Sequence, residues 1–242
     1  MDRSALALLK RAYARGAQGT GRVLSRAGVL PDDPPARSRR LRHWAYSLTR
    51  AHDSLGISAL DVPWWTYGSI DSVERWLADT EGPVHAFEWG SGASTIWLSR
   101  RLAAVHSVEH HPQFGQMIQE ALAGVPNATL DIVEPVESAA PEVASAKEGH
   151  GRLDFAPYVR HIDGVAADHG PFELIVIDGR ARAACLTAAL PHLADGGIVV
   201  FDNTLRRRYR AAIAAAPVSE EIHRGLTPTL PYPDQTSILR AV

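Results

Sequence analysis

A chain of 242 residues that is 45% hydrophobic can bury the core of one large α/β domain or of two small ones. Its single cysteine, Cys185, excludes a disulfide framework within the chain, and no apolar run approaches the roughly 20 residues that a membrane-spanning helix requires. We therefore expect a cytoplasmic protein with neither a signal peptide nor a transmembrane segment.

The formal net charge of -2 hides an asymmetry between the first fifty residues and the rest of the chain. Residues 1–50 carry eleven Lys or Arg against three Asp, whereas residues 51–242 carry fourteen Lys or Arg against twenty-four acidic residues. This split predicts a basic arm on an acidic body. The arm either packs on its own body or a second subunit, or contacts a membrane surface or nucleic acid. Because the acidic body would repel a phosphate backbone, we do not expect a nucleic-acid substrate.

The N-terminal part of the chain favours helices. Residues 3–28 lack proline and space their apolar side chains as a basic amphipathic helix would, and the proline-rich segment 28–38 then ends that helix. A second helix is expected over 39–52. Residues 1–60 are therefore predicted to form a basic helical extension, whose helices offer a surface for a homo-oligomer. Residues 61–242 are predicted to form the main domain.

After this extension, Ser69 or Asp71 can cap a helix that runs to residue 78. Just before it, Trp64 and Trp65 either line a binding cleft or pack in the core. From residue 84 onward, apolar strand-like segments alternate with helical ones. The expected strands are 84–89, 103–109, 128–135, 172–179, 198–203 and a last one at 236–242, and the expected helices are 93–102, 112–124 and 181–197.

Strands that alternate with helices of ten to fifteen residues predict an α/β fold with a doubly wound, mostly parallel sheet. Such sheets bind ligands at the carboxyl ends of their strands. The long segment 135–170 exceeds an ordinary connection and is expected to be a functional or mobile loop.

The segment AFEWGSGAST, residues 86–95, forms a glycine turn between the first expected strand and a helix. A dinucleotide site would have a third glycine where Thr95 stands, and Glu88 would repel a pyrophosphate. The turn better suits a ligand with an ammonium, a carboxylate and a nucleoside, whose carboxylate can accept hydrogen bonds from the helix N-terminus and Ser94. Glu109 ends the second strand, where a carboxylate can accept hydrogen bonds from two ribose hydroxyls; alternatively, it is an ordinary exposed loop carboxylate.

The ordered set of ExGxGxS at 88–94, HSVEHH, IVIDG and GGIVVFDN resembles the class I S-adenosylmethionine-dependent methyltransferases over roughly residues 62–242. The resemblance implies a seven-stranded Rossmann-like methyltransferase sheet that binds S-adenosyl-L-methionine. It also implies a set of cofactor-binding residues, which are Glu88, Gly90, Ser91, Gly92, Ser94, Glu109, His110 and Asp178. Glu134 would lie near the adenine.

A second group of polar residues follows two later strands. Asp178 ends the fourth expected strand, and Asp202 and Asn203 end the fifth, so neighbouring strand ends would bring two carboxylates and an amide oxygen together. Such an oxygen-rich cluster suits Mg²⁺ or a similar divalent cation. The pattern is similar to that of metal-dependent small-molecule O-methyltransferases, which implies a catalytic role for Asp178. Alternatively, Asp178 contacts only the cofactor, and the other two residues only cap a turn.

The general base of such a reaction is not fixed by the sequence. Catechol-type enzymes of this kind have a lysine three residues after the first metal aspartate, and here that position is Ala181. His150, His161 and Asp154 in the long loop are the candidates, and we choose the two histidines. The flanking Arg180 and Arg182 either pair with an anionic substrate or are solvated at a helix start.

The expected function is metal-assisted O-methylation of a hydroxyl on a saccharide or secondary metabolite. The alternatives are a metal-independent small-molecule methyltransferase and a non-catalytic methyltransferase-like binding subunit.

Overall fold

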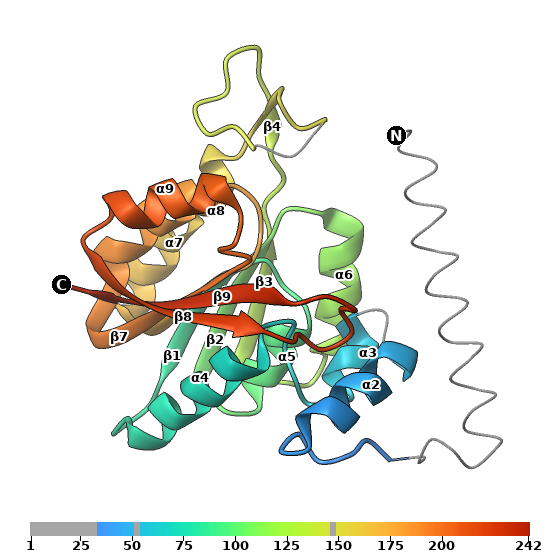
Figure 1. The fold of residues 1–242 in the computed structure, drawn as a ribbon. Helices are drawn as coiled ribbons and strands as arrows, with labels where there is room; N and C mark the ends of the chain where they lie inside the picture. Colours follow the sequence, from blue (N-terminus) through green and yellow to red (C-terminus); the bar gives the residue numbers. More distant parts are fainter. Residues whose placement is uncertain (1–32, 51–53, 146–148) are drawn as a thin grey trace.

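The computed structural model describes residues 33–50, 54–145 and 149–242, and its centre is a sheet in the strand order β3-β2-β1-β6-β7-β9-β8 (Figure 1). The predicted helix at 3–28 lies outside the described residues. The strands are β1 (His85–Trp89), β2 (Ala104–Glu109), β3 (Ala128–Ile132), β6 (Phe172–Ile177), β7 (Leu193–Asp202), β8 (Val218–Gly225) and β9 (Asp234–Ala241). The pairs from β3 to β7 are parallel, and β9 is antiparallel to β7 and β8. The predicted mostly parallel, seven-stranded sheet is confirmed.

The central strands are apolar along nearly their whole length because both faces of the sheet are covered. In β6, the residues from Leu174 to Ile177 are fully buried, and alternate side chains enter two different cores. In β1, Ala86 points into one core while Phe87 and Trp89 point into the other. This two-sided burial makes the sheet doubly wound.

Helices cover the two faces of the sheet in separate groups (Figure 1). Residues of α3, α4 and α5 form one core with the sheet, residues of α7, α8 and α9 form the other, and α6 packs against β3. The helices are α2 (Arg40–Arg50), α3 (Ser54–Ser58), α4 (Tyr67–Asp79), α5 (Ala93–Ser99), α6 (Pro112–Ala121), α7 (Ala156–His169), α8 (Arg182–Ala189) and α9 (Arg207–Ala215). Among the described residues, no helix has the length and apolarity needed to cross a membrane.

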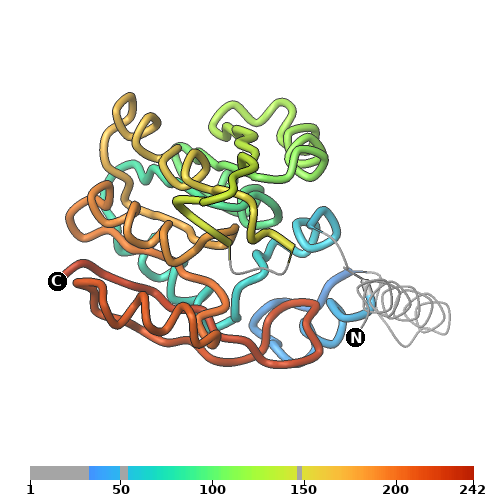
Figure 2. Tube along the Cα trace, turned by 90° about the horizontal axis from the view of Figure 1, so that it is seen from above, coloured from blue at the N-terminus to red at the C-terminus, as the bar shows by residue number. Residues whose placement is uncertain are grey.

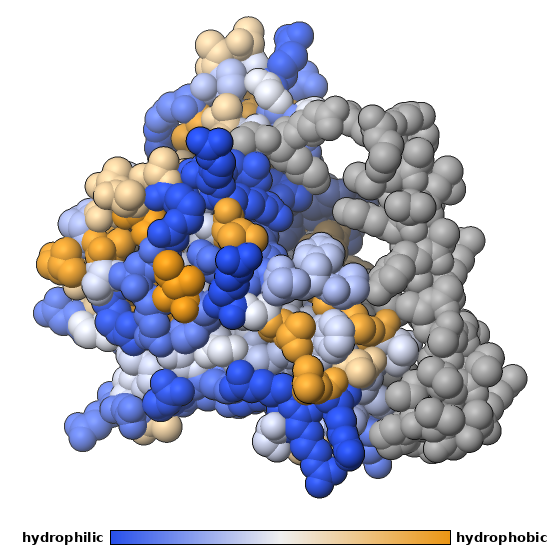
Figure 3. Space-filling view, in the orientation of Figure 1, coloured by the Kyte–Doolittle hydropathy of each residue, from blue (hydrophilic) through white to orange (hydrophobic). Residues whose placement is uncertain are grey.

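The described part of the predicted extension packs on the body of the molecule. The indole N–H of Trp44 donates to the carbonyl oxygen of Leu230 at 2.8 Å, and His43 Nδ1 lies 2.7 Å from the hydroxyl of Tyr67. Figure 2 shows α2 (blue) beside the loop between β8 and β9 (red). On the face seen in Figure 3, the described apolar side chains form small separate groups among hydrophilic ones. The homo-oligomer therefore stays a prediction.

Three regions of the chain differ from the prediction. The expected loop 135–170 contains the helix α7, as well as the short strands β4 (Val136–Glu137) and β5 (Leu153–Asp154), which pair with each other. The helix expected over 181–197 ends at Ala189, and β7 already begins at Leu193. The helix α9 and the strand β8 were not predicted.

Candidate functional site

The glycine turn after β1 packs directly against the loop after β6. Gly90 has a φ of +94°, a backbone conformation that glycine adopts far more readily than other residues. A side-chain carbon at Gly90 would lie 2.7 Å from the backbone nitrogen of Gly179. A side-chain carbon at Gly179 would in turn lie 1.9 Å from the hydroxyl of Tyr158 on α7. The two loops approach this closely because both positions are glycine.

Gly179→Ala is therefore expected to destabilise the protein by about 1–3 kcal/mol, the usual range for forcing an extra carbon into a packed site. In a Tyr158→Phe background the penalty should be smaller, because the oxygen that the new carbon would meet is gone. Urea denaturation of the single and double variants measures this coupling. Equal penalties in the two backgrounds would contradict the proposed contact.

Glu88 lies beneath the turn and is fully buried. Its carboxylate accepts hydrogen bonds from the hydroxyls of Ser94 and Thr95, each at 2.5 Å, and from that of Ser107 at 2.7 Å. Burial raises the pKa of Glu88 to about 7 in spite of these three hydroxyl donors. Glu88 and Ser94 therefore stabilise the glycine turn through buried hydrogen bonds and do not line the cavity described below.

The raised pKa of Glu88 has a consequence for stability. The neutral carboxyl contributes stability that is fully present below its ordinary pKa of 4.5 and is lost as the pH rises through about 7. Relative to Glu88→Gln, the wild-type protein should lose about 3 kcal/mol over this range, because one pKa unit corresponds to about 1.4 kcal/mol. Urea denaturation of both proteins across the range measures the difference. A gap that does not change with pH would rule out this titration.

Glu109 ends β2 and is 3% exposed. Its Oε1 accepts hydrogen bonds from the backbone N–H groups of His110 and His111 at 2.8 and 2.9 Å, and its Oε2 accepts one from that of Ser91 at 3.2 Å. Burial opposes ionisation, but the hydrogen bonds and the neighbouring His110 outweigh it and lower the pKa of Glu109. Glu109 therefore stays a carboxylate, which accepts hydrogen bonds and donates none.

A cavity of about 940 Å³ opens at the carboxyl ends of β1, β2, β3, β6 and β7. Trp64, Phe114 and Glu134 contribute to its wall. The sequence-predicted site residues that line it are Gly90, Ser91, Glu109, His110, His150, Asp178 and Asn203. The predicted residues outside its lining are Glu88, Gly92, Ser94, His161 and Asp202.

The three candidate bases are separated by the fold. His150 lines the cavity, where its ring stacks parallel to that of Phe155 at 6.0 Å. The Nε2 atom of His161 lies 2.8 Å from a carboxylate oxygen of Asp131, outside the cavity, so its position removes His161 as a base for chemistry there. Asp154 accepts backbone hydrogen bonds that hold the loop around β5.

The two predicted metal carboxylates, Asp178 and Asp202, share a buried cation from their own chain. Arg182 is 5% exposed, and its Nη2 donates to Asp178 Oδ1 at 2.6 Å while its Nη1 lies 3.6 Å from Asp202 Oδ2. The same guanidinium donates to the backbone carbonyls of Asp178, Gly179 and Asp202. Arg182 is therefore a structural counter-ion, which corrects its suggested pairing with a substrate.

The amide nitrogen of the third predicted ligand, Asn203, donates to a carboxylate oxygen of Asp234 at 2.8 Å. The hydroxyl of Thr236 donates to Asp202 Oδ1 at 2.8 Å. Within the described ranges, no group of three or more His, Cys, Asp or Glu side chains has an arrangement suited to a metal ion. Because the Arg182 guanidinium already pairs with Asp178 and lies close to Asp202, the residues around Asp178 do not fit a divalent cation.

Comparisons with known proteins agree with this geometry. Residues 87–204 match a family model described as a methyltransferase domain, a range that spans both the glycine turn and the end of β7. An O-methyltransferase from Bacillus cereus, solved with S-adenosylhomocysteine, has a TM-score of 0.51 and 17% identity, covering 93% of this chain and 98% of that chain.

Two other solved structures are more distant. An rRNA methylase from Streptococcus thermophilus has a TM-score of 0.47 and 12% identity, covering 72% of this chain and 96% of that chain. A ribosomal protein L11 methylase from Lactobacillus delbrueckii subsp. bulgaricus has a TM-score of 0.43 and 14% identity, covering 73% of this chain and 80% of that chain. No curated protein matches the chain in sequence.

Proposed function

We propose that the chain is a class I S-adenosylmethionine-dependent methyltransferase that methylates a hydroxyl of a small molecule without the help of a divalent cation. The observation that carries the proposal is the buried Glu109 carboxylate, which lines a large cavity beside the glycine turn. A carboxylate at the end of the second strand can accept hydrogen bonds from two ribose hydroxyls. The Bacillus cereus O-methyltransferase, which shares the fold, supports oxygen as the acceptor atom.

In this proposal, the cavity holds S-adenosylmethionine along the strand ends. Glu109 binds the ribose, and the backbone of Gly90 and Ser91 passes close to the methionine part. His110 and Glu134, which line the same cavity, lie near the adenine. S-adenosylmethionine supplies an electrophilic methyl group on a sulfonium.

The chain's own residues then position the acceptor and accept its proton. A hydroxyl oxygen becomes a better nucleophile when a general base accepts its proton, and His150 is the base candidate that lines the cavity. Most of the rate gain would come from holding the acceptor in line and from excluding water, because methyl transfer needs no protein nucleophile.

The absence of a metal requirement follows from Arg182. Its guanidinium contacts Asp178 and lies close to Asp202, so a second cation would meet a positive charge there. Conversion of S-adenosylmethionine to S-adenosylhomocysteine is therefore expected to continue in excess EDTA, measured with a panel of phenols and sugars as acceptors.

The outcomes of this assay separate the alternatives. Activity that EDTA removes and Mg²⁺ restores would contradict the metal-independent reaction. It would support the predicted metal site at Asp178, Asp202 and Asn203. A chain that neither turns over nor binds S-adenosylhomocysteine would contradict the catalytic function, leaving the non-catalytic binding subunit.

A further inference from the structure

Arg180 is a half-buried arginine that has no ion-pair partner among the described residues. Its Nε is buried and has no hydrogen-bond partner, and no described carboxylate forms an ion pair with its guanidinium. Other partly buried arginines are paired in the same structure, for example Arg37 with Glu74 and Arg210 with Glu220. Removing a charge from water without a partner is costly. Arg180 therefore lies where an anion from outside the chain would be stabilised.

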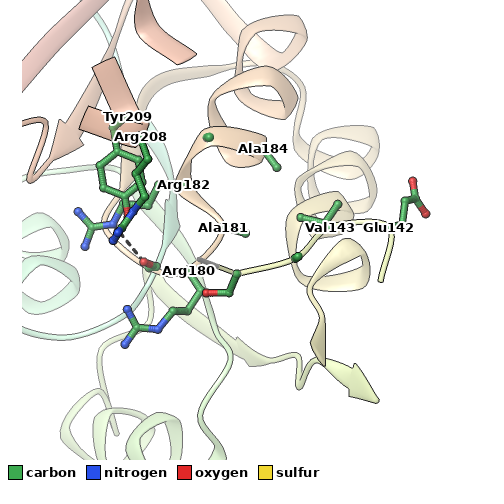
Figure 4. Close-up of a pocket in the computed structure, with 12 residues that line it drawn as sticks. Glu142, Val143, Arg180, Ala181, Arg182, Ala184, Arg208 and Tyr209 are labelled. Carbon is green, nitrogen blue, oxygen red and sulfur yellow. Dashed lines mark hydrogen bonds between the residues drawn. The ribbon is translucent and has the colours of Figure 1, made fainter. Parts of the chain in front are cut away.

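Two cavities meet at this residue. Gly179, Arg180 and Arg182 line both the cavity of about 940 Å³ and a neighbouring one of about 340 Å³. Figure 4 shows Arg180 and Arg182 extending to the same side of their loop. The positive charge of Arg182 is a cause, after burial, of the lowered pKa of Arg180.

Further arginines lie on the walls of these cavities. Arg206 lines the larger cavity, and Arg208 lines the smaller one, where its guanidinium lies over the ring of Tyr209. Neither forms an ion pair with a described residue. Of the acidic residues that line the two cavities, Asp178 is paired with Arg182, Glu142 with Arg160, and Glu109 with backbone N–H groups, whereas Glu134 is exposed on the wall of the larger cavity. The junction of the cavities thus carries unpaired positive charge.

We propose that the methyl acceptor carries a carboxylate or a phosphate, which Arg180 binds at the junction of the two cavities together with Arg206 on the wall of the larger cavity. This inference rests on the proposed function, because it names the class of molecule that the same site methylates. Both anions have planar or tetrahedral oxygen groups that an arginine can bind through two parallel hydrogen bonds. An anionic anchor at this loop would hold the acceptor beside the cofactor cavity.

The test is calorimetric titration of the protein, saturated with S-adenosylhomocysteine, with inorganic phosphate and separately with acetate. The variants are Arg180→Gln and Arg206→Gln. The matched control is Arg207→Gln, because Arg207 is exposed and adjacent to Arg206 but lines neither cavity. At least one anion is expected to bind the wild-type protein and the control alike. Both site variants should bind that anion about tenfold more weakly, the effect of losing about 1.4 kcal/mol.

The two anions distinguish a phosphorylated acceptor from a carboxylated one. Binding of S-adenosylhomocysteine without binding of either anion would overturn this inference and leave the proposed function in place. Loss of S-adenosylhomocysteine affinity in Arg180→Gln would also overturn it, because Arg180 would then belong to the cofactor site. A wild-type protein that binds no S-adenosylhomocysteine would overturn the proposed function itself.

Discussion

Replacing Arg182 with methionine is expected to destabilise the fold by about 3–5 kcal/mol, the usual cost of removing one partner from a buried ion pair. The reason is that the Asp178 carboxylate would lose its counter-ion, and Asp202, which is 4% exposed, would lose the neighbouring guanidinium. Three backbone carbonyls would lose their donor as well. Urea denaturation at neutral pH measures the loss.

The matched control for this substitution is Arg210→Met. Arg210 pairs with Glu220, but its side chain is 38% exposed, and a pair of that kind contributes about 1 kcal/mol or less. A further variant combines Arg182→Met with Asp178→Asn and Asp202→Asn, and it should recover part of the lost stability because no buried charge remains unpaired. If Arg182→Met costs no more than Arg210→Met, Arg182 is not the counter-ion that we describe.

Glu109→Gln is expected to weaken the binding of S-adenosylhomocysteine by about 10- to 100-fold. A hydrogen bond to a charged group contributes about 1.5–3 kcal/mol, and a glutamine presents only one acceptor oxygen where the carboxylate presents two. Titration calorimetry measures the affinity directly.

The control for this experiment is Glu120→Gln, an exposed position on the neighbouring helix α6. Glu109 also accepts backbone hydrogen bonds at the turn after β2, so urea denaturation must show that the variant is folded at the temperature of the titration. A folded Glu109→Gln protein with unchanged affinity would place the ribose elsewhere.

The parts of the fold that could be predicted from the sequence are those with a strong local signal. The apolar runs of β6 and β7 predicted strands of the sheet. The glycine turn at Gly90 predicted the edge of the cavity. The helix α7 was missed because the whole segment 135–170 was interpreted as one long loop. Its apolar residues Tyr158 and Ile162 nevertheless have helical spacing and are fully buried.

The parts of the site that could not be predicted depend on contacts between distant segments. Asp178 and Arg182 have the spacing of an ion pair on a helix, which the sequence displays. Their burial beside Asp202, however, depends on how β6 and β7 lie together, and that pairing turns an apparent metal site into an internal ion pair. The close approach of Gly90 and Gly179 likewise joins residues that are far apart in the chain.

The most direct test of the cofactor site is a crystal structure of the protein with S-adenosylhomocysteine. The expected result is one molecule in the cavity at the ends of β1 and β2, with both ribose hydroxyls within hydrogen-bond distance of the Glu109 carboxylate. A molecule bound elsewhere, or a ribose that does not contact Glu109, would contradict the account of the site given above.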